Sequence, residues 1–131
     1  MKPKQKTITP RPGRTVGEIE ADISEAIIRF EREYMGRGPE EARTYVIDDL
    51  IIVRLRGVLT PAEKQLARSE GQGRALIKQV RMELLEKARP LLAALIQEIT
   101  GRPVRSLHTD ISTVTGERMI IFSCGHPPAH R

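Results

Sequence analysis

The chain has 131 residues, enough for one domain, and a formal net charge of +5. No apolar run approaches the roughly 20 residues that a spanning helix needs, and no apolar segment follows the basic start, so the sequence predicts neither a membrane span nor a secretory signal. A single cysteine, Cys124, excludes an internal disulfide and fits a reducing compartment, so we expect a cytoplasmic protein.

The positive charge is concentrated at the two ends of the chain. Without the six terminal bases, 16 basic residues stand against 17 acidic ones. Aromatic residues make up only 3% and tryptophan is absent, which disfavours a base-stacking surface. Binding of nucleic acid through the basic N-terminal arm is therefore the third-ranked function. The terminal bases are Lys2, Lys4, Lys6, Arg11, Arg14 and Arg131.

Residues 1–13 contain three prolines among basic residues and predict a disordered arm. A single domain is expected over residues 14–124, beginning with a helix over 15–35 that Thr15 caps. Apolar residues recur there at three- and four-residue spacing, which is typical of an amphipathic helix. They are Val16, Ile19, Ile23, Ala26, Ile27, Phe30 and Tyr34.

Two strands over 43–48 and 50–57 are predicted next, joined by a tight turn at Asp48-Asp49. In this register one face carries residues suited to the core: Thr44, Val46, Ile51, Val53 and Leu55. The other face is too apolar to remain comfortably in water, so we expect it to form an interface between copies of the chain. It carries Tyr45, Ile47, Leu50 and Ile52.

Two helices are predicted over 61–69 and 74–100. Thr60, Pro61 and Glu63 have the pattern of a capping box. The longer helix should be bent or divided at Pro90. The stripe expected to face the core is Leu76, Val80, Leu84, Ala88, Leu91, Leu95 and Ile99, widened by Ile77, Leu85, Leu92 and Ile96.

The last two strands are predicted over 104–114 and 117–124, with a two-residue turn at Thr115-Gly116. This register pairs Val114 with Glu117, Ser112 with Met119, Asp110 with Ile121 and His108 with Ser123. One face is apolar apart from a threonine: Leu107, Thr109, Ile111, Ile120 and Phe122. The other carries a candidate functional polar group, His108, Asp110 and Ser112. A flexible tail is expected over 125–131.

The predicted order is α-β-β-α-α-β-β. Two antiparallel hairpins that combine into one four-stranded sheet, with the helices packed on one face, satisfy this order most simply. The expected fold class is therefore α+β.

The polar residues of the last two strands allow two interpretations. His108, Asp110, Ser112 and Ser123 contain the residue types of a hydrolytic triad, but two strand positions separate the His from the Asp and no nucleophile-elbow turn surrounds either serine. An enzyme or ligand sensor that uses His108 and Asp110 is thus the alternative to our expectation of no catalytic residue. A polar strand face that bonds to a neighbouring loop or subunit is the favoured interpretation.

The C-terminal tail holds Cys124, His126 and His130, with His108 as a conceivable fourth zinc ligand. The spacing spans two prolines and lacks the paired ligands of structural zinc sites, so no metal is expected. The glycine pair within 36–39 lacks the lysine and hydroxyl of a phosphate-binding loop, so no cofactor is expected either.

Two sequence blocks resemble a bacterial family, the MpsC-type component of a sodium-translocating, membrane-potential-generating system. The first block runs from Gly36 to Pro39 and from Tyr45 to Lys64. The second runs from Leu107 to Ser112 and continues through Thr115 to Arg118, with Ile99 to Gly101 between the two blocks. The match extends over about residues 15 to 123.

The resemblance implies a small accessory protein linked to ion or inorganic-carbon transport at the membrane. We therefore expect a non-enzymatic cytoplasmic regulatory protein that forms a homo-oligomer, most simply a dimer. A membrane transporter subunit is the other expected partner. In the dimer, His108, Asp110 and Ser112 are expected to border the apolar interface and fix its register.

Overall fold

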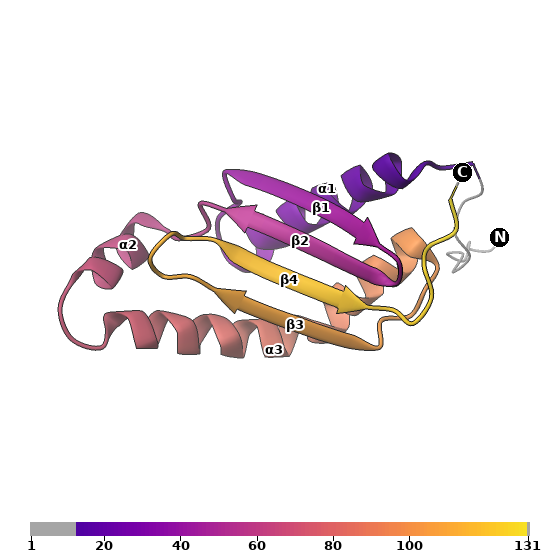
Figure 1. The fold of residues 1–131 in the computed structure, drawn as a ribbon. Helices are drawn as coiled ribbons and strands as arrows, with labels where there is room; N and C mark the ends of the chain where they lie inside the picture. Colours follow the sequence, from indigo (N-terminus) through magenta and orange to yellow (C-terminus); the bar gives the residue numbers. More distant parts are fainter. Residues whose placement is uncertain (1–12, 131) are drawn as a thin grey trace.

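The computed structural model describes residues 13–130 as an α+β domain with the predicted order of elements. The strands form one antiparallel sheet in the order β1-β2-β4-β3, so the two hairpins lie side by side. In Figure 1, α1 and α3 lie behind the sheet and α2 lies beyond one end of it. The predicted fold class is confirmed. The predicted arm, Gly13 apart, lies outside the described residues. The elements are α1 (Val16–Tyr34), β1 (Glu41–Ile47), β2 (Leu50–Arg56), α2 (Pro61–Arg68), α3 (Gly73–Thr100), β3 (Ser106–Ile111) and β4 (Arg118–Ser123).

Both predicted capping threonines begin their helices. The Thr15 hydroxyl accepts a hydrogen bond from the Glu18 amide at 3.1 Å, and the Glu18 carboxylate accepts one from the Thr15 amide at 2.9 Å. Thr60 and Glu63 make the same reciprocal pair at the start of α2. Each capping box satisfies two amides that the first helical turn leaves without partners.

The first hairpin has the predicted register, with Ile47 opposite Leu50 and Val46 opposite Ile51. Asp48 supports the tight turn with a φ of 54°, which aspartate tolerates better than most residues. Because side chains alternate along a strand, this register buries Ile51 and leaves Ile47 exposed.

The predicted register of the second hairpin is wrong by two residues. Asp110 lies opposite Met119, and His108 lies opposite Ile121. A two-residue turn would need positive φ at Thr115, a β-branched residue, and in the structure only Gly116 has it, at 77°. A wider loop replaces the turn, closed by hydrogen bonds from the Ser112 amide to the Glu117 carbonyl and from the Gly116 amide to the Ser112 carbonyl. Since the error is an even number of residues, the core face remains the same.

Helix α3 is undivided and its ribbon changes direction along its length in Figure 1, as the bent form of the prediction has it, but only part of its predicted apolar stripe is buried. It runs through Pro90 as one helix, and because position 90 is exposed, the carbonyl left without an amide partner can meet water. The predicted stripe is largely outside: Leu76, Val80, Leu84 and Leu91 are exposed. The buried line consists of Ala88 and the residues predicted to widen the stripe, together with an arginine that was not predicted. It comprises Ile77, Arg81, Leu85, Ala88, Leu92 and Ile96.

The core lies between the sheet and the helices α1 and α3. α1 contributes Ile23 and Ile27, and the sheet contributes the inward residues of every strand. The C-terminal residues contact this body: the Gly125 amide donates to the Asp49 carboxylate at 3.2 Å, and Arg102 donates to the Pro127 carbonyl at 2.8 Å. The most deeply buried strand residues are Ile51, Val53, Leu55, Ile120 and Phe122.

Candidate functional site

The outer face of the sheet, opposite the helices, is made of residues that alternate with the core along each strand. The observed pairings align them in rows across the sheet. The central row is Tyr45, Ile52, Ile121 and His108. One neighbouring row is Ile47, Leu50, Ser123 and Ser106, and the other is Arg43, Arg54, Met119 and Asp110.

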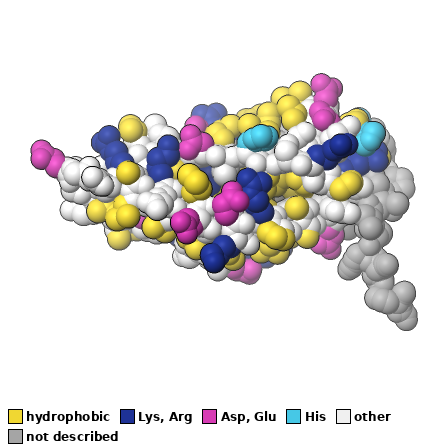
Figure 2. Space-filling model, turned by 90° about the horizontal axis from the view of Figure 1, so that it is seen from below, with side chains coloured by type: hydrophobic (Ala, Val, Ile, Leu, Met, Phe, Trp, Pro, Cys, Tyr) yellow, Lys and Arg dark blue, Asp and Glu magenta, His cyan; other side chains and the backbone are white. Residues whose placement is uncertain are grey.

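The outer face exposes more apolar surface than scattered single residues would. Tyr45 is 40% and Ile47 is 52% exposed, and Leu50, Ile52 and Ile121 are partly exposed beside them. Figure 2 shows the outer face only edge-on, along its upper margin, where several hydrophobic side chains lie; hydrophobic and charged side chains are mixed over the rest of this view. Contiguous apolar patches of this kind often mark interfaces.

The structure keeps two of the three polar residues predicted to act together on one strand face and places the third in the loop that follows. His108 and Asp110 are exposed on strand β3, on the outer face. Ser112 lies beyond the strand, where its hydroxyl accepts a hydrogen bond from the Thr115 amide at 3.1 Å. Ser123 lies opposite Ser106, whereas the predicted register placed it opposite His108.

Asp110 is held by neighbours at the edge of the sheet. Its carboxylate accepts a hydrogen bond from the Ile111 amide at 2.8 Å and lies 3.3 Å from the Lys78 amine. These two contacts lower the pKa of Asp110 from its ordinary value, so the group is a carboxylate at neutral pH.

A second group of polar residues, which the sequence reasoning missed, lies in the core. Glu31 of α1 and Arg118 of β4 are 0% and 2% exposed, and their charged groups are 3.9 Å apart. Arg81 of α3 makes two hydrogen bonds to Glu63, at 2.9 and 2.7 Å, and one to the Val58 carbonyl. This buried charge cluster thus connects α1, α2, α3 and the sheet.

Electrostatics differ between the two pairs of the buried charge cluster. Burial raises the pKa of Glu31 more than the nearby charges of Arg118 and Arg81 lower it. Burial acts in the same direction on Glu63, but hydrogen bonds from Arg81 and from the Thr60 amide prevail and lower its pKa. Neither Glu31 oxygen has a hydrogen-bond partner. The Glu31–Arg118 pair therefore has fewer of its hydrogen bonds made than the Glu63–Arg81 pair.

The residues considered for zinc are not gathered into a site. Cys124 is buried, and burial raises the pKa of its thiol, whereas His126 and His130 are exposed. Over residues 13–130, no group of three or more His, Cys, Asp or Glu side chains has an arrangement that could hold a metal ion.

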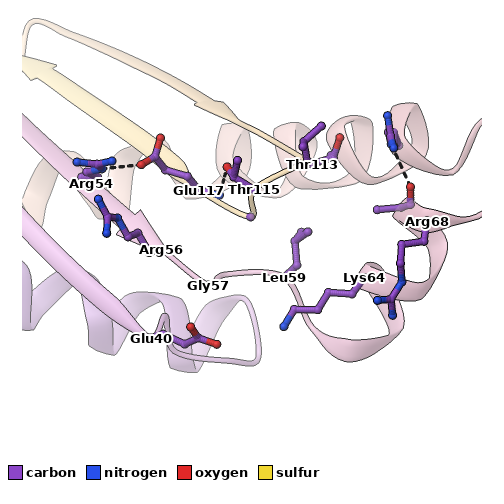
Figure 3. Close-up of a pocket in the computed structure, with 14 residues that line it drawn as sticks. Glu40, Arg54, Arg56, Gly57, Leu59, Lys64, Arg68, Thr113, Thr115 and Glu117 are labelled. Atoms are coloured by element: carbon purple, nitrogen blue, oxygen red, sulfur yellow. Dashed lines mark hydrogen bonds and ion pairs between the residues drawn. The ribbon is translucent and has the colours of Figure 1, made fainter.

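A third feature is a cavity of about 670 Å³ between α2, the ends of β2 and β4, and the loop after β3 (Figure 3). Its lining is rich in arginine and lysine. Arg54 is paired with Glu117 at 2.5 Å, and Arg56 lies 3.6 Å from Glu41. We call this space the basic cavity.

Comparison with known proteins identifies the family. Residues 15–125 match the family described as the Na+-translocating membrane potential-generating system (MpsC). The chain belongs to the MpsC family. It is also 44% identical over 109 residues to the uncharacterised protein YbcI of Bacillus subtilis strain 168, covering 83% of this chain and 87% of that protein. No solved structure matches significantly.

The two blocks that carry the MpsC resemblance lie in the parts of the fold described above. The first includes β2 and the start of α2, and so supplies one half of the outer face and one wall of the basic cavity. The second includes β3 and the loop that closes the cavity. Among residues 13–130 of this MpsC chain, no helix has both the length and the apolar character needed to cross a membrane.

Sequence signals existed for the features that were missed. Arg118 stands two positions before Ile120, so strand alternation alone places it on the core face. Lys64 and Arg68 of this MpsC chain are four residues apart in α2, so they share one side of that helix. The partners of both sets come from distant segments, and only the fold brings them together.

Proposed function

We propose that this chain is a non-enzymatic, cytoplasmic accessory component of a membrane-potential-generating system, and that it works as a homodimer formed through the outer face of the sheet. Membership of the MpsC family supports the link to the system. The observation that carries the dimer is the self-complementary arrangement of the outer face.

Self-complementarity follows from the strand order and the observed rows. A two-fold axis parallel to the strands, above the boundary of β2 and β4, places β1 of one copy over β3 of the other. Arg43 then faces Asp110 of the second copy, and the pair occurs twice. Ile52 faces Ile121 at the centre. Opposite charges at matched positions favour this pairing and set its register.

The other in-plane two-fold axis, perpendicular to the strands, gives a poorer match. It places the row that contains Ile47 and Leu50 over the row that contains Arg43 and Arg54, so apolar side chains meet guanidinium groups. Aligned packing of two sheets, with strands about 30° apart, is compatible with the parallel axis and keeps the central pairs in contact.

The size of the face predicts a reversible dimer. Four strands spaced about 4.8 Å apart and about 20 Å long give a flat area of about 400 Å² for each copy. The side chains that project from this plane increase the accessible area further. The total buried area is then at the lower end of specific interfaces. We therefore expect a dissociation constant in the micromolar range, about 8 kcal/mol of binding free energy.

The enzyme or sensor alternative, with His108 and Asp110 as its centre, has less support. Both side chains project from an open strand face, and neither lines the basic cavity. In the proposed dimer His108 faces Tyr45 of the second copy and Asp110 faces Arg43, which uses both residues for assembly.

Sedimentation velocity over a range of protein concentrations tests the dimer. Wild type should shift from monomer to dimer, whereas Ile52→Glu should remain monomeric because it buries a carboxylate at the centre of the interface. Leu76→Glu is the matched control, since Leu76 is an exposed apolar residue of α3, away from the sheet face. A wild type that stays monomeric at high micromolar concentration contradicts the proposal.

The link to the membrane system needs a cellular measurement. In cells whose membrane potential depends on this chain, a potential-sensitive dye should report a reduced potential for Ile52→Glu and a normal one for Leu76→Glu, at equal protein levels. Full function of a proven monomer would separate dimerisation from the activity of the system and contradict the proposed role of the dimer.

A further inference from the structure

The basic cavity has more positive charge than its own carboxylates compensate. Its lining has five cationic side chains and two carboxylates. Both carboxylates already have arginine partners: Glu117 pairs with Arg54, and Glu40 lies 3.5 Å from Arg37. The five cations are Arg54, Arg56, Lys64, Arg68 and Arg74.

Three of these cations come from α2 and the start of α3 and have no carboxylate within ion-pair distance among residues 13–130. Arg74 donates to the Ala67 carbonyl at 3.0 Å, and Arg68 donates to the Gln65 side chain at 3.1 Å. Neither contact neutralises charge. Lys64 extends its amine into the space between Leu59 and Glu40 in Figure 3. Three uncompensated charges around one cavity predict an anionic ligand.

Two glycines with positive φ lie in the walls of the cavity. Gly57 has a φ of 67°, a left-handed conformation that favours glycine, and it lies close to the Glu40 side chain. Gly116, on the facing loop, also has positive φ, and its carbonyl oxygen accepts a hydrogen bond from the Val58 amide at 3.1 Å. The exposed Val114 and the nearly buried Leu59 and Ala67 form the apolar part of the lining. The volume of about 670 Å³ is within the usual range for small-molecule sites.

We propose that the basic cavity binds a small anion with two or more linked phosphoryl groups, such as a nucleoside diphosphate. Each terminal phosphate carries about two negative charges near neutral pH, and arginine forks match phosphate oxygens geometrically. Linked phosphoryl groups can span cations on both helices, which a single phosphate cannot do equally well. The apolar wall next to Leu59 suits the non-phosphate part of the ligand.

Isothermal titration calorimetry with the full chain tests this site, with pyrophosphate, ADP, inorganic phosphate and adenosine as the probes. Pyrophosphate and ADP should bind at least about tenfold more tightly than inorganic phosphate, and adenosine should not bind, because the site recognises linked phosphoryl groups. Lys64→Glu should weaken pyrophosphate binding by about tenfold or more, corresponding to a loss of at least about 1.4 kcal/mol.

Lys87→Glu is the matched control, because it makes the same change of net charge at an exposed lysine of α3 outside the cavity. It should bind pyrophosphate as wild type does, and circular dichroism should show both variants folded. Arg68→Gln, a milder change in the same cavity, should weaken binding to an intermediate extent. Equal loss in Lys64→Glu and Lys87→Glu would overturn the site, since it would show only a general effect of charge.

A second arm distinguishes a free ligand from a lipid headgroup. Binding to phosphatidylglycerol vesicles, with no binding of pyrophosphate or ADP below about 1 mM, would overturn the proposal in favour of a membrane surface. The monomeric Ile52→Glu variant should bind pyrophosphate as wild type does, so failure of the dimer and failure of this site are separable.

Discussion

The two faces of the sheet use charged and apolar side chains in opposite ways. The inner face encloses Arg118 between apolar neighbours, 2% exposed, while the outer face leaves Tyr45 and Ile47 40% and 52% exposed. Burying an ion costs several kcal/mol unless its partners are well placed, and exposing large apolar side chains forgoes burial energy. The difference shows that buried charges join the helices to the sheet on the inner face, whereas the outer face leaves an apolar surface exposed, which the proposed dimer would cover.

The largest effect should come from the buried charge cluster. Glu31→Leu removes the counter-charge of Arg118, which cannot lose its proton in the core, and should lower the free energy of unfolding by about 3–5 kcal/mol. The double variant Glu31→Leu/Arg118→Met should lose much less, because an apolar pair leaves no isolated ion. Urea denaturation measures both.

An exposed ion pair provides the control for that experiment. Glu86 and Arg89 lie one helical turn apart on α3, and Glu86→Leu should change stability by no more than about 0.5 kcal/mol. Equal losses from Glu31→Leu and Glu86→Leu would remove the distinction between the interior and the surface.

A smaller effect should separate two isoleucines of the first hairpin. Ile51→Ala, on the inner face, should cost about 2–5 kcal/mol because it leaves a cavity in the core. Ile47→Ala, on the outer face, should change monomer stability by less than about 0.5 kcal/mol. Denaturation at low protein concentration measures the first effect, and sedimentation should show that only Ile47→Ala weakens dimerisation without unfolding. Similar stability losses would mean that the faces are energetically alike.

The smallest effect concerns Glu63 and depends on pH. Because the folded protein lowers the pKa of Glu63 below its ordinary value of 4.5, the carboxylate contributes stability above that pH, and this contribution is lost as pH falls through the folded pKa. Glu63→Gln should therefore cost about 1–2 kcal/mol at pH 7 and progressively less below pH 4.5. A loss that stays constant with pH would show that charge is not the cause.

Much of the fold follows from local rules that need no tertiary information. Thr15 and Thr60 cap helices because the acidic residue three positions later completes each box. Asp48 tolerates a left-handed conformation, so the first hairpin and both its faces were predicted correctly. The prediction of a two-residue turn was wrong at Thr115, because a β-branched residue does not readily adopt the positive φ that this turn requires.

Other features depend on contacts that no short segment encodes. The buried side of α3 was predicted only in part. Ile77, Leu85 and Leu92 are buried as expected, whereas the predicted Leu76 and Val80 remain outside. Arg81 is buried because its partner Glu63 lies in α2. The basic cavity draws its lining from the strand ends, α2 and the loop after β3, which meet only in the folded chain. Neither could be read from hydrophobic periodicity.

A charge swap measured by sedimentation equilibrium tests the proposed dimer most directly. Arg43→Glu and Asp110→Lys should each weaken the dimer by about tenfold or more, because each places like charges opposite one another twice. The double variant Arg43→Glu/Asp110→Lys restores opposite charges and should dimerise nearly as well as wild type. A double variant as weak as the two losses combined would contradict the two-fold arrangement of the sheets.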